Sequence, residues 1–483
     1  MEEFEIKDIQ GIIVRGYGYM PAACFVLLGI QDARLGRTWL GVVPDEISDG
    51  DSKPPKVAFN IAFTHAGLER LGLGSETLMG FSREFQEGMV TNHRSRILGD
   101  HGRSAPQSWD WGGSKKDITS SNGEVHILLM LYAINAEELQ KLYLLNKGRL
   151  KDAGLIEIRK LDTVELAKRK EHFGFHDGIA QPAISGLKKR RGTSKNIIAT
   201  GEIVLGYPNQ YGKYPEVPMV PSAKDQKGLL PQSNDGGAGR DFGRNGSYLV
   251  FRQLRQDVHA FWQFIDKATK NPDGSSNIDA RIKLASKMVG RWPGGAPLVL
   301  APEGDREILE DKDSFGYSKS DPFGLKCPIG SHIRRTNPRD SMEPGPEGSL
   351  TVSNRHRILR RGRSYGNPIH ELMMQDLIPD KPPSNEERGL YFICFNASIS
   401  RQFEFVQQTW INNPKFEGLY DDPDPITGDQ DPDDDGTTGA FTIQAEPVRR
   451  WVNSLPRFVE VRGGAYFFMP GIRALRYIAS LAR

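Results

Sequence analysis

The chain is poor in cysteine, with only Cys24, Cys327 and Cys394 among its 483 residues. The three are far apart in the sequence, form no Cys-x-x-Cys pair and are odd in number. A disulfide framework or a cysteine-rich zinc site is therefore not expected. Scarce, scattered cysteine instead favours a protein that works in a reducing interior.

Segments typical of export or membrane insertion are also missing. The first residues, MEEFEIKDIQGIIVRG, lack the basic start, apolar core and small-residue cleavage site of a secretory signal. No apolar run approaches the length of about 20 residues that spans a bilayer. We therefore predict a cytoplasmic protein without a membrane partner, and export without a cleavable signal stays open as an alternative.

A strong excess of one charge is absent as well, because 63 basic residues stand against 61 acidic ones for a net charge of +2. This balance gives no reason to expect a nucleic-acid partner. A hydrophobic content of 38% and a charged content of 26% are typical of a globular protein with a sizeable core. The length exceeds one ordinary small domain. The composition does not choose between a monomer and a small homo-oligomer.

Apolar stretches rich in aliphatic and aromatic residues predict strands, and amphipathic stretches predict helices. The expected strands cover residues 23–31, 57–63, 124–134, 247–254 and 389–395, and the expected helices cover 64–73, 135–150, 255–269, 278–292 and 400–411. These lengths suit an α+β fold in which helices pack on antiparallel sheets.

A stretch rich in Pro, Gly, Asn and Asp, residues 206–246, predicts a connecting segment. It would join an N-terminal half, residues 1–215, to a C-terminal half, residues 240–483. The acidic tract from Asp421 to Asp435 predicts a solvated loop. Whether that tract holds a cation such as manganese or calcium is left open.

The first segment with chemical potential is CPIGSHIRRTNPRD, in which Arg334, Arg335 and Arg339 follow His332. A neutral imidazole is the usual proximal ligand of haem iron, and guanidinium groups suit the haem propionates. By spacing alone, a surface loop whose basic residues face water is the simpler interpretation.

In the second segment, FGFHDGIAQP, Gly174 and Gly178 bound a turn that carries Asp177. Glycine lets the backbone bring a carboxylate close to a flat ligand. His172 and His176 have the spacing of a helical metal pair, but the two glycines oppose a helix. Taken alone, an aspartate in such a turn more often bonds its own backbone.

In the third segment, RHRILRRGRSYG, strand alternation predicts that one of Arg360 and Arg361 points inward and the other towards solvent. An inward arginine needs an anion, which a peroxide or haem pocket supplies. An edge strand carrying basic residues is the common alternative.

Together the three segments resemble the dye-decolorizing peroxidase family. GFHDG (174–178) matches its Gly-x-x-Asp-Gly signature, SHIRRTNPR (331–339) is similar to the proximal histidine segment of its longer members, and RRGRSYG (360–366) is similar to the strand with the distal arginine. Further similar segments follow in order over nearly the whole chain. Ser364 replaces the usual proline, which puts the local turn in doubt.

The resemblance implies two ferredoxin-like halves and one haem b per chain, held mainly by the C-terminal half. It implies His332 as the axial ligand on iron, with Arg334 and Arg339 also binding haem. Leu390 and Phe392 would line the distal face above the porphyrin.

The resemblance further implies Asp177 as the distal acid–base residue and Arg360 as its partner. These roles agree with peroxide chemistry, since Asp177 would relay a proton between the two oxygens and Arg360 would stabilise the departing one. A carboxylate on the far nitrogen of His332 would make the imidazole more basic. Asp424 is the first candidate for that carboxylate, and Glu404 is the second.

Bulky dyes do not fit a cavity sized for peroxide, so an oxidisable side chain is expected to carry electrons outward. Tyr365 is the best candidate, and Trp410 or Trp292 would serve likewise, although core packing is the simpler interpretation of both tryptophans.

The main hypothesis is thus a haem peroxidase using hydrogen peroxide and an aromatic reductant. One alternative is a haem-binding protein of the same fold that stores or delivers haem or strips its iron. Another is a haem-free metal enzyme that uses His172, His176 and Asp177.

Overall fold

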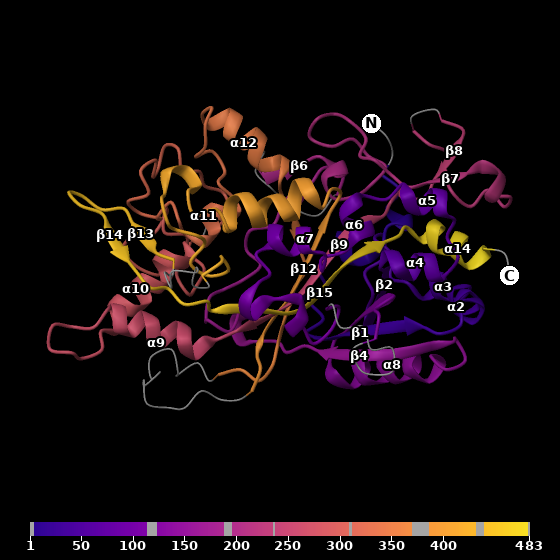
Figure 1. Cartoon of the computed structure of the whole chain (residues 1–483), viewed down its shortest axis with the longest axis horizontal. Helices are drawn as coiled ribbons and strands as arrows, with labels where there is room; N and C mark the ends of the chain where they lie inside the picture. Colours follow the sequence, from indigo (N-terminus) through magenta and orange to yellow (C-terminus); the bar gives the residue numbers. More distant parts are fainter. Residues whose placement is uncertain are drawn as a thin grey trace.

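The computed structural model describes residues 4–113, 123–187, 196–234, 237–308, 312–369, 386–430 and 439–481. Its main feature is one nine-stranded antiparallel sheet in the order β10-β12-β9-β15-β2-β3-β1-β4, with β11 also paired to β12 (Figure 1). The strands are β1 (Ala22–Ile30), β2 (Val57–Phe63), β3 (Ile127–Ala133), β4 (Leu155–Asp162), β9 (Ser247–Gln256), β10 (Leu359–Arg360), β11 (Arg363–Tyr365), β12 (Gly389–Asn396) and β15 (Val459–Met469).

The first half of the chain contributes four strands and the second half five, and leaving β11 aside the two sets have the same spatial order. The order in space is β4-β1-β3-β2 in the first half and β15-β9-β12-β10 in the second. When these strands are numbered by chain order within each half, both halves have the spatial order 4-1-3-2. The predicted α+β fold with two antiparallel ferredoxin-like halves is confirmed. The two sheets also join edge to edge, where Phe468 of β15 pairs with Phe63 of β2. The sequence did not predict this join.

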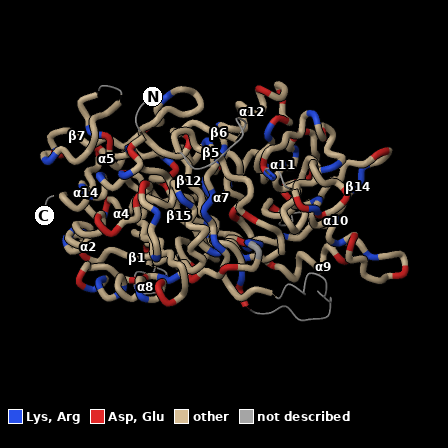
Figure 2. The backbone as a smooth tube through the Cα atoms, turned by 180° about the vertical axis from the view of Figure 1, so that it is seen from behind, with Lys and Arg blue, Asp and Glu red and all other residues tan. Residues whose placement is uncertain are grey.

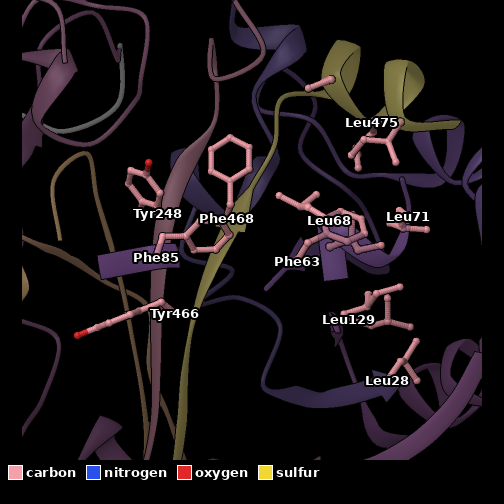
Figure 3. Packing of buried hydrophobic residues seen from close by; sticks show 14 of the residues in the cluster. Leu28, Phe63, Leu68, Leu71, Phe85, Leu129, Tyr248, Tyr466, Phe468 and Leu475 are labelled. Carbon is pink, nitrogen blue, oxygen red and sulfur yellow. The ribbon is translucent and has the colours of Figure 1, made fainter. Parts of the chain in front are cut away.

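Both faces of the first-half sheet are buried. On β1, Val26 and Leu28 belong to one apolar cluster, and Phe25 and Leu27 belong to a second cluster on the opposite face. This is why the strand is apolar at nearly every position rather than at alternate ones. Figure 3 shows part of the first cluster, in which Leu475 of α14 (Ile472–Ser480) packs towards the sheet.

Several helices begin after a residue whose side chain accepts a backbone N–H of the first turn. The longer helices are α2 (Ala33–Leu40), α8 (Ala136–Arg149), α9 (Val258–Ala268), α10 (Ile278–Val289) and α12 (Pro346–Arg355), and the shorter ones are α1 (Gly11–Val14), α3 (Val43–Glu46), α4 (His65–Arg70), α5 (Ser75–Met79), α6 (Arg83–Glu87), α7 (Asn92–Leu98) and α11 (His332–Thr336). The side chain of Asn135 accepts the N–H of Glu138 at 2.9 Å at the start of α8. None of the described helices has the length and apolar character needed to cross a membrane.

The expected helix over residues 400–411 is present in an unusual form. Two π-helical elements, η8 (Ser400–Glu404) and η9 (Val406–Ile411), follow each other there. The N–H of Glu404 donates to the carbonyl of Ile399 at 2.9 Å, five residues back. Such wide turns are frequent at functional sites.

Short two-stranded sheets occupy the connections. They are β5 (Ala183–Ile184) with β6 (Ile197–Ile198), β7 (Met219–Pro221) with β8 (Gly239–Asp241), and β13 (Phe441–Ile443) with β14 (Arg450–Val452). The second of these lies within the predicted connecting segment 206–246. The division into residues 1–215 and 240–483 stays a prediction, and the sheet strands of the two halves fall in residues 22–162 and 247–469.

The acidic tract is not the solvated loop that its composition predicted. Asp422 is 3% exposed and Asp424 is fully buried, because both carboxylates accept hydrogen bonds inside the protein. Residues 431–435 of the tract lie outside the described residues. Elsewhere, Figure 2 shows basic and acidic residues interspersed along the backbone, in keeping with the balanced total charge.

Candidate active site

A cavity of about 270 Å³ lies on the sheet of the second half. Neighbouring strands form its floor, because Leu390 and Phe392 of β12 pair with Leu254 and Arg252 of β9, and all four line the cavity. Side chains alternate along a strand, so these residues share one face of the sheet. The walls come from residues 171–180, α10, α11 and the π-helical elements.

His332 is the first residue of α11 and lies in one wall of the cavity. Its Nδ1 donates to Oδ2 of Asp424 over 2.9 Å. The other oxygen of Asp424 accepts the backbone N–H groups of Ile426 and Thr427, both at 2.9 Å. Asp424 is thus held in place and fixes the imidazole, while no hydrogen bond among the described residues involves the Nε2 atom of His332.

The charges of this pair reinforce each other. Burial opposes a charged imidazole, but the negative charge of Asp424 and its hydrogen bond outweigh burial and raise the pKa of His332. Burial is likewise outweighed at Asp424, where His332 lowers the pKa of the carboxyl group. The structure therefore places the first candidate, Asp424, beside His332. The second candidate, Glu404, instead binds Arg94 and Tyr466.

The loop that carries Asp177 is held by the side chain of Glu171. This carboxylate accepts the backbone N–H of Phe173 at 2.8 Å and that of Phe175 at 2.9 Å. Gly178 has a φ of 76°, in the left-handed region that favours glycine. The loop is therefore an irregular, internally bonded turn, as the glycines predicted.

The two histidines of this loop do not form a helical metal pair. His172 is buried, with its Nε2 2.8 Å from the carbonyl oxygen of Tyr365, whereas His176 lines the cavity. Within the described ranges, no group of three histidine, cysteine or acidic side chains is placed to hold a metal ion. The geometry therefore gives the haem-free metal enzyme no support.

Arg360, on β10, meets Asp177 in the cavity wall. Its Nη1 lies 3.0 Å from Oδ1 of Asp177, which also accepts the N–H of Gly178 at 2.6 Å. The backbone N–H of Arg360 donates to Oε1 of Gln181 at 2.9 Å and so fixes the strand. The Asp177 side chain is 37% accessible because it opens on the cavity. Its second oxygen, Oδ2, has no hydrogen bond to any described residue.

Burial tends to raise the pKa of Asp177, but the positive charge of Arg360 outweighs it and lowers the pKa of the carboxyl group. The carboxylate is therefore ionised at neutral pH and has one oxygen free to take a proton. A fixed cation beside a free carboxylate oxygen is suited to moving a proton while stabilising negative charge.

The strand pattern predicted that one of the two arginines points into solvent, but Arg361, like Arg360, is bonded inside the protein. The Nε and Nη2 of Arg361 donate to the carbonyl oxygens of Ile12 at 2.9 Å and Ile13 at 3.0 Å. The guanidinium thus ties β10 to α1, because the carbonyl groups at the end of that four-residue helix need donors.

The prediction that Arg334 binds haem is wrong in this structure. Arg334 is fully buried and is not part of the cavity lining. Its Nη1 donates to the carbonyls of Asp321 and Cys327, both at 3.1 Å, and its guanidinium lies 4.4 Å from the ring centre of Tyr317. The neighbouring Arg335 is also buried and bonded to backbone carbonyls such as that of Asn413.

Arg339 does line the cavity, together with a residue that the sequence analysis missed, Arg291. Arg339 forms a close ion pair with Asp313, whereas Nη2 of Arg291 lies 3.7 Å from the same carboxylate and makes no hydrogen bond within the described part of the chain. Burial and the nearby Arg339 lower the pKa of Arg291 to about 10. Two guanidinium groups thus share one carboxylate, which leaves an unbalanced positive charge in the wall.

Arg291 lies in the segment GRWPGGAPL (290–298), one of the further segments that resemble the family. Its arginine follows a glycine with a φ of 95° that ends α10, so the pattern predicts a turn and not the direction of the side chain. Arg339 itself has a φ of 58°, a strained conformation for a residue other than glycine.

The three predicted electron carriers are all buried, since Tyr365 and Trp292 are 6% exposed and Trp410 is 4% exposed. Tyr365 stacks on Tyr391 with the ring centres 4.6 Å apart. Both belong to the apolar cluster on the sheet face opposite the cavity. Other side chains cover the ring of Tyr365, so a bulky donor does not reach it directly, and its role in carrying electrons outward stays a prediction.

Comparisons with known proteins agree with this geometry. Residues 304–422 match the family model described as Dyp-type peroxidase, C-terminal. The chain is 30% identical to a dye-decolorizing peroxidase of Auricularia auricula-judae, over 97% of this chain and 86% of that protein. A crystal structure of a decolorizing peroxidase from the same organism superposes with a TM-score of 0.77 at 25% identity, covering 98% of this chain and all of that one. A further solved structure, a dye-decolorizing peroxidase in complex with 2,6-dimethoxyphenol, superposes with a TM-score of 0.76 at 24% identity, over 99% of this chain and 100% of that one.

Proposed function

The chain belongs to the dye-decolorizing peroxidase family and is a peroxidase, and from this premise we propose that it binds haem b through His332 and reduces hydrogen peroxide with Asp177 and Arg360. The reducing partners would be dyes and phenols, the class to which the 2,6-dimethoxyphenol of the solved relative belongs. The observation that carries this proposal is that two hydrogen-bonded pairs, His332 with Asp424 and Arg360 with Asp177, meet at one cavity, which His332, Arg360 and Asp177 line.

Three features of the cavity support haem b. The Nε2 atom of His332 is left for the iron, while Asp424 holds Nδ1. Leu390 and Phe392 supply an apolar surface for a flat macrocycle. The donor set, an imidazole backed by a carboxylate, suits iron.

The propionates of haem require positive charge, and the pair Arg291 and Arg339 offers it. The orphaned Nη2 of Arg291 and the single shared carboxylate of Asp313 leave room for one more anion. A propionate would supply that anion and a bidentate acceptor. The same chemistry was expected of Arg334, whose place Arg291 takes in this proposal.

Bound haem would supply the iron at which the O–O bond breaks and the oxidising equivalents that donors consume. The protein supplies proton handling and charge. Oδ2 of Asp177 takes the proton from the inner oxygen of peroxide and returns it to the outer one. Arg360 stabilises the negative charge of the departing oxygen, and it keeps Asp177 ionised beforehand. Asp424 keeps the proton of His332 on Nδ1, so that Nε2 stays an electron donor.

A protein that only stores, delivers or strips haem needs the His332 side of the cavity but not the paired Asp177 and Arg360. The close contact of these two residues, with one free carboxylate oxygen, favours peroxide turnover over haem transport.

Reconstitution with haem tests the proposal, because the cavity contains three histidines, His176, His332 and His356. Each is changed to alanine, and haem is titrated while the Soret band is recorded. We expect the wild type and the variants at His176 and His356 to bind one haem, and His332→Ala to lose stable haem and peroxidase activity. Normal haem content, spectrum and turnover in His332→Ala would place the ligand elsewhere. Absence of a Soret band in the wild type would remove the haem proposal altogether.

A further inference from the structure

Glu404 and Tyr466 form a buried hydrogen-bonded pair that the proposed mechanism does not use. The hydroxyl of Tyr466 donates to Oε1 of Glu404 over 2.8 Å, and both residues are 3% exposed. Oε2 of Glu404 accepts from Nη1 of Arg94, also over 2.8 Å. A tyrosine is more easily oxidised when a base is in place to take its proton, since a charged phenol radical is avoided.

The pair lies directly beside the floor of the cavity. On β15, Gly464 is opposite Arg252 of β9, and Tyr466 follows two residues later on the same face. Arg252 lines the cavity, as does Phe403, whose ring centre is 6.3 Å from that of Tyr466. In Figure 3 the hydroxyl of Tyr466 points away from the labelled aliphatic side chains. Tyr466 is therefore one residue removed from the reacting space and closed off from solvent.

The charges around Glu404 favour its taking a proton. Arg94 faces three carboxylates, Glu404 at 2.8 Å, Glu87 at 2.9 Å and Glu84 at 3.6 Å, and Glu87 also pairs with the exposed Arg83, so two cations meet three carboxylates. Protonation of one carboxylate relieves the excess of negative charge. Burial raises the pKa of Glu404, and burial together with the charge of Glu404 raises the pKa of Tyr466 well above its usual range. The phenol is thus neutral at rest and faces a strengthened base.

Tyr248 shows how the arrangement differs from ordinary packing. It is buried on the same face of the neighbouring strand, but its hydroxyl accepts the backbone N–H of Ser82 at 2.9 Å and has no carboxylate partner in the described residues. It is a matched control for Tyr466 in size, burial and sheet position.

We propose that Tyr466 and Glu404 form a proton-coupled redox site that takes an oxidising equivalent from the cavity when no donor is bound. One electron passes from the phenol of Tyr466 to the group in the cavity that hydrogen peroxide has oxidised. The O–H bond breaks, and its proton moves to Oε1 of Glu404, leaving a neutral tyrosyl radical. An electron from a later phenol or dye, with the same proton returned from Glu404, restores the pair. The proposal rests on the proposed haem site.

The test uses the haem-loaded full chain mixed with hydrogen peroxide in the absence of a donor, freeze-quenched and examined by electron paramagnetic resonance. We expect a tyrosyl radical whose signal narrows when the protein contains ring-deuterated tyrosine. Tyr466→Phe should lose most of this signal, and Tyr248→Phe should keep it. An unchanged tyrosyl signal in Tyr466→Phe, or no tyrosyl signal in a wild type that consumes peroxide, overturns the proposal.

Glu404→Gln keeps an oxygen to accept the hydrogen bond but removes the base. The radical should then form several-fold more slowly and lose the solvent isotope effect that the wild type shows. Equal rates and equal isotope effects in the wild type and Glu404→Gln would overturn the proton-coupled role. This comparison does not depend on Tyr466→Phe, so it holds even if that variant does not fold. Peroxide consumption is followed in the same samples, because failure of the haem site would stop that consumption in the wild type, whereas failure of the tyrosine proposal alone would not.

Discussion

The two aspartates beside the cavity, Asp424 paired with His332 and Asp177 paired with Arg360, differ in access. Asp424 is fully buried, and both of its oxygens are engaged, one by His332 and the other by two backbone N–H groups. Asp177 is 37% accessible and keeps Oδ2 without a partner in the described residues. A carboxylate with every oxygen engaged fixes its neighbour, whereas one with a free oxygen is able to exchange a proton. The hydrogen bonds made by the two carboxylates, rather than residue type, separate Asp424 from Asp177, the acid that we propose to move a proton.

The local sequence causes this difference. Asp424 opens the turn DPITG, whose next N–H groups bend back to its side chain. In GFHDG the N–H of the following glycine reaches only Oδ1 of Asp177, at 2.6 Å, and Arg360 approaches the same oxygen. Each pair is therefore set up by a few residues adjacent to the aspartate together with one partner distant in the sequence, His332 or Arg360.

The largest expected effect follows from removing the acid that we propose to move a proton. Asp177→Asn should keep haem but slow the reaction with peroxide by roughly 10²- to 10⁴-fold, because the amide does not relay a proton. Stopped-flow mixing of the haem-loaded variant with peroxide measures this rate. If the rate stays near that of the wild type, a water molecule or peroxide itself moves the proton. The free oxygen of Asp177 would then not distinguish its role from that of Asp424.

Arg360→Leu should slow the same step by about 10²- to 10³-fold, the usual effect of losing one stabilising donor. It should also change the pH profile. Arg360 lowers the pKa of Asp177, so its removal raises that pKa, and the acid-side loss of rate moves to higher pH. Arg360→Lys keeps the charge and should leave that limb close to its wild-type position. An acid limb that stays in place in Arg360→Leu would show that another group governs it.

Asp424→Asn should act on binding more than on the peroxide reaction. Losing the carboxylate behind a metal-binding histidine typically weakens metal affinity or activity by about 10- to 100-fold. The rate of haem loss to an excess of a haem-scavenging protein measures the effect on haem binding. Stopped-flow mixing with peroxide measures the effect on the peroxide reaction. A loss of peroxide rate as large as in Asp177→Asn, with haem retention unchanged, would show that Asp424 acts on the peroxide reaction and not on haem binding.

The smallest effect is expected at Tyr365, outside both pairs. Tyr365→Phe preserves ring volume, so stability should barely change. Because the ring is 6% exposed and lies on the far face of the sheet, turnover of an anthraquinone dye and of a small phenol should fall slightly and in parallel. A selective, several-fold loss with the dye would restore Tyr365 as an electron carrier inside the protein.

Much of the fold was readable from the sequence because the strands are apolar on both faces and the helices carry polar caps. The pairing of β15 with β2 could not be predicted from the sequence, because pairing between strands distant in the chain leaves no local pattern. In the site, the resemblance of three segments to a known family pointed to His332, Asp177 and Arg360. Only tertiary structure separates Arg334, used inside the protein, from Arg291, which opens on the cavity. Side-chain direction in an irregular turn depends on contacts that a sequence does not display.

The place of β15 in the sheet has a consequence for biosynthesis. It is the last strand of the sheet in chain order, yet it lies in the middle, between β9 and β2. Until translation passes residue 469, the two halves share no edge, and the cavity lacks Val459 and Val461. An N-terminal half folds first on the ribosome, with β2 as an unpaired edge. Cofactor capture thus follows translation of β15, and nascent chains stalled earlier expose strand edges that invite chaperones or aggregation.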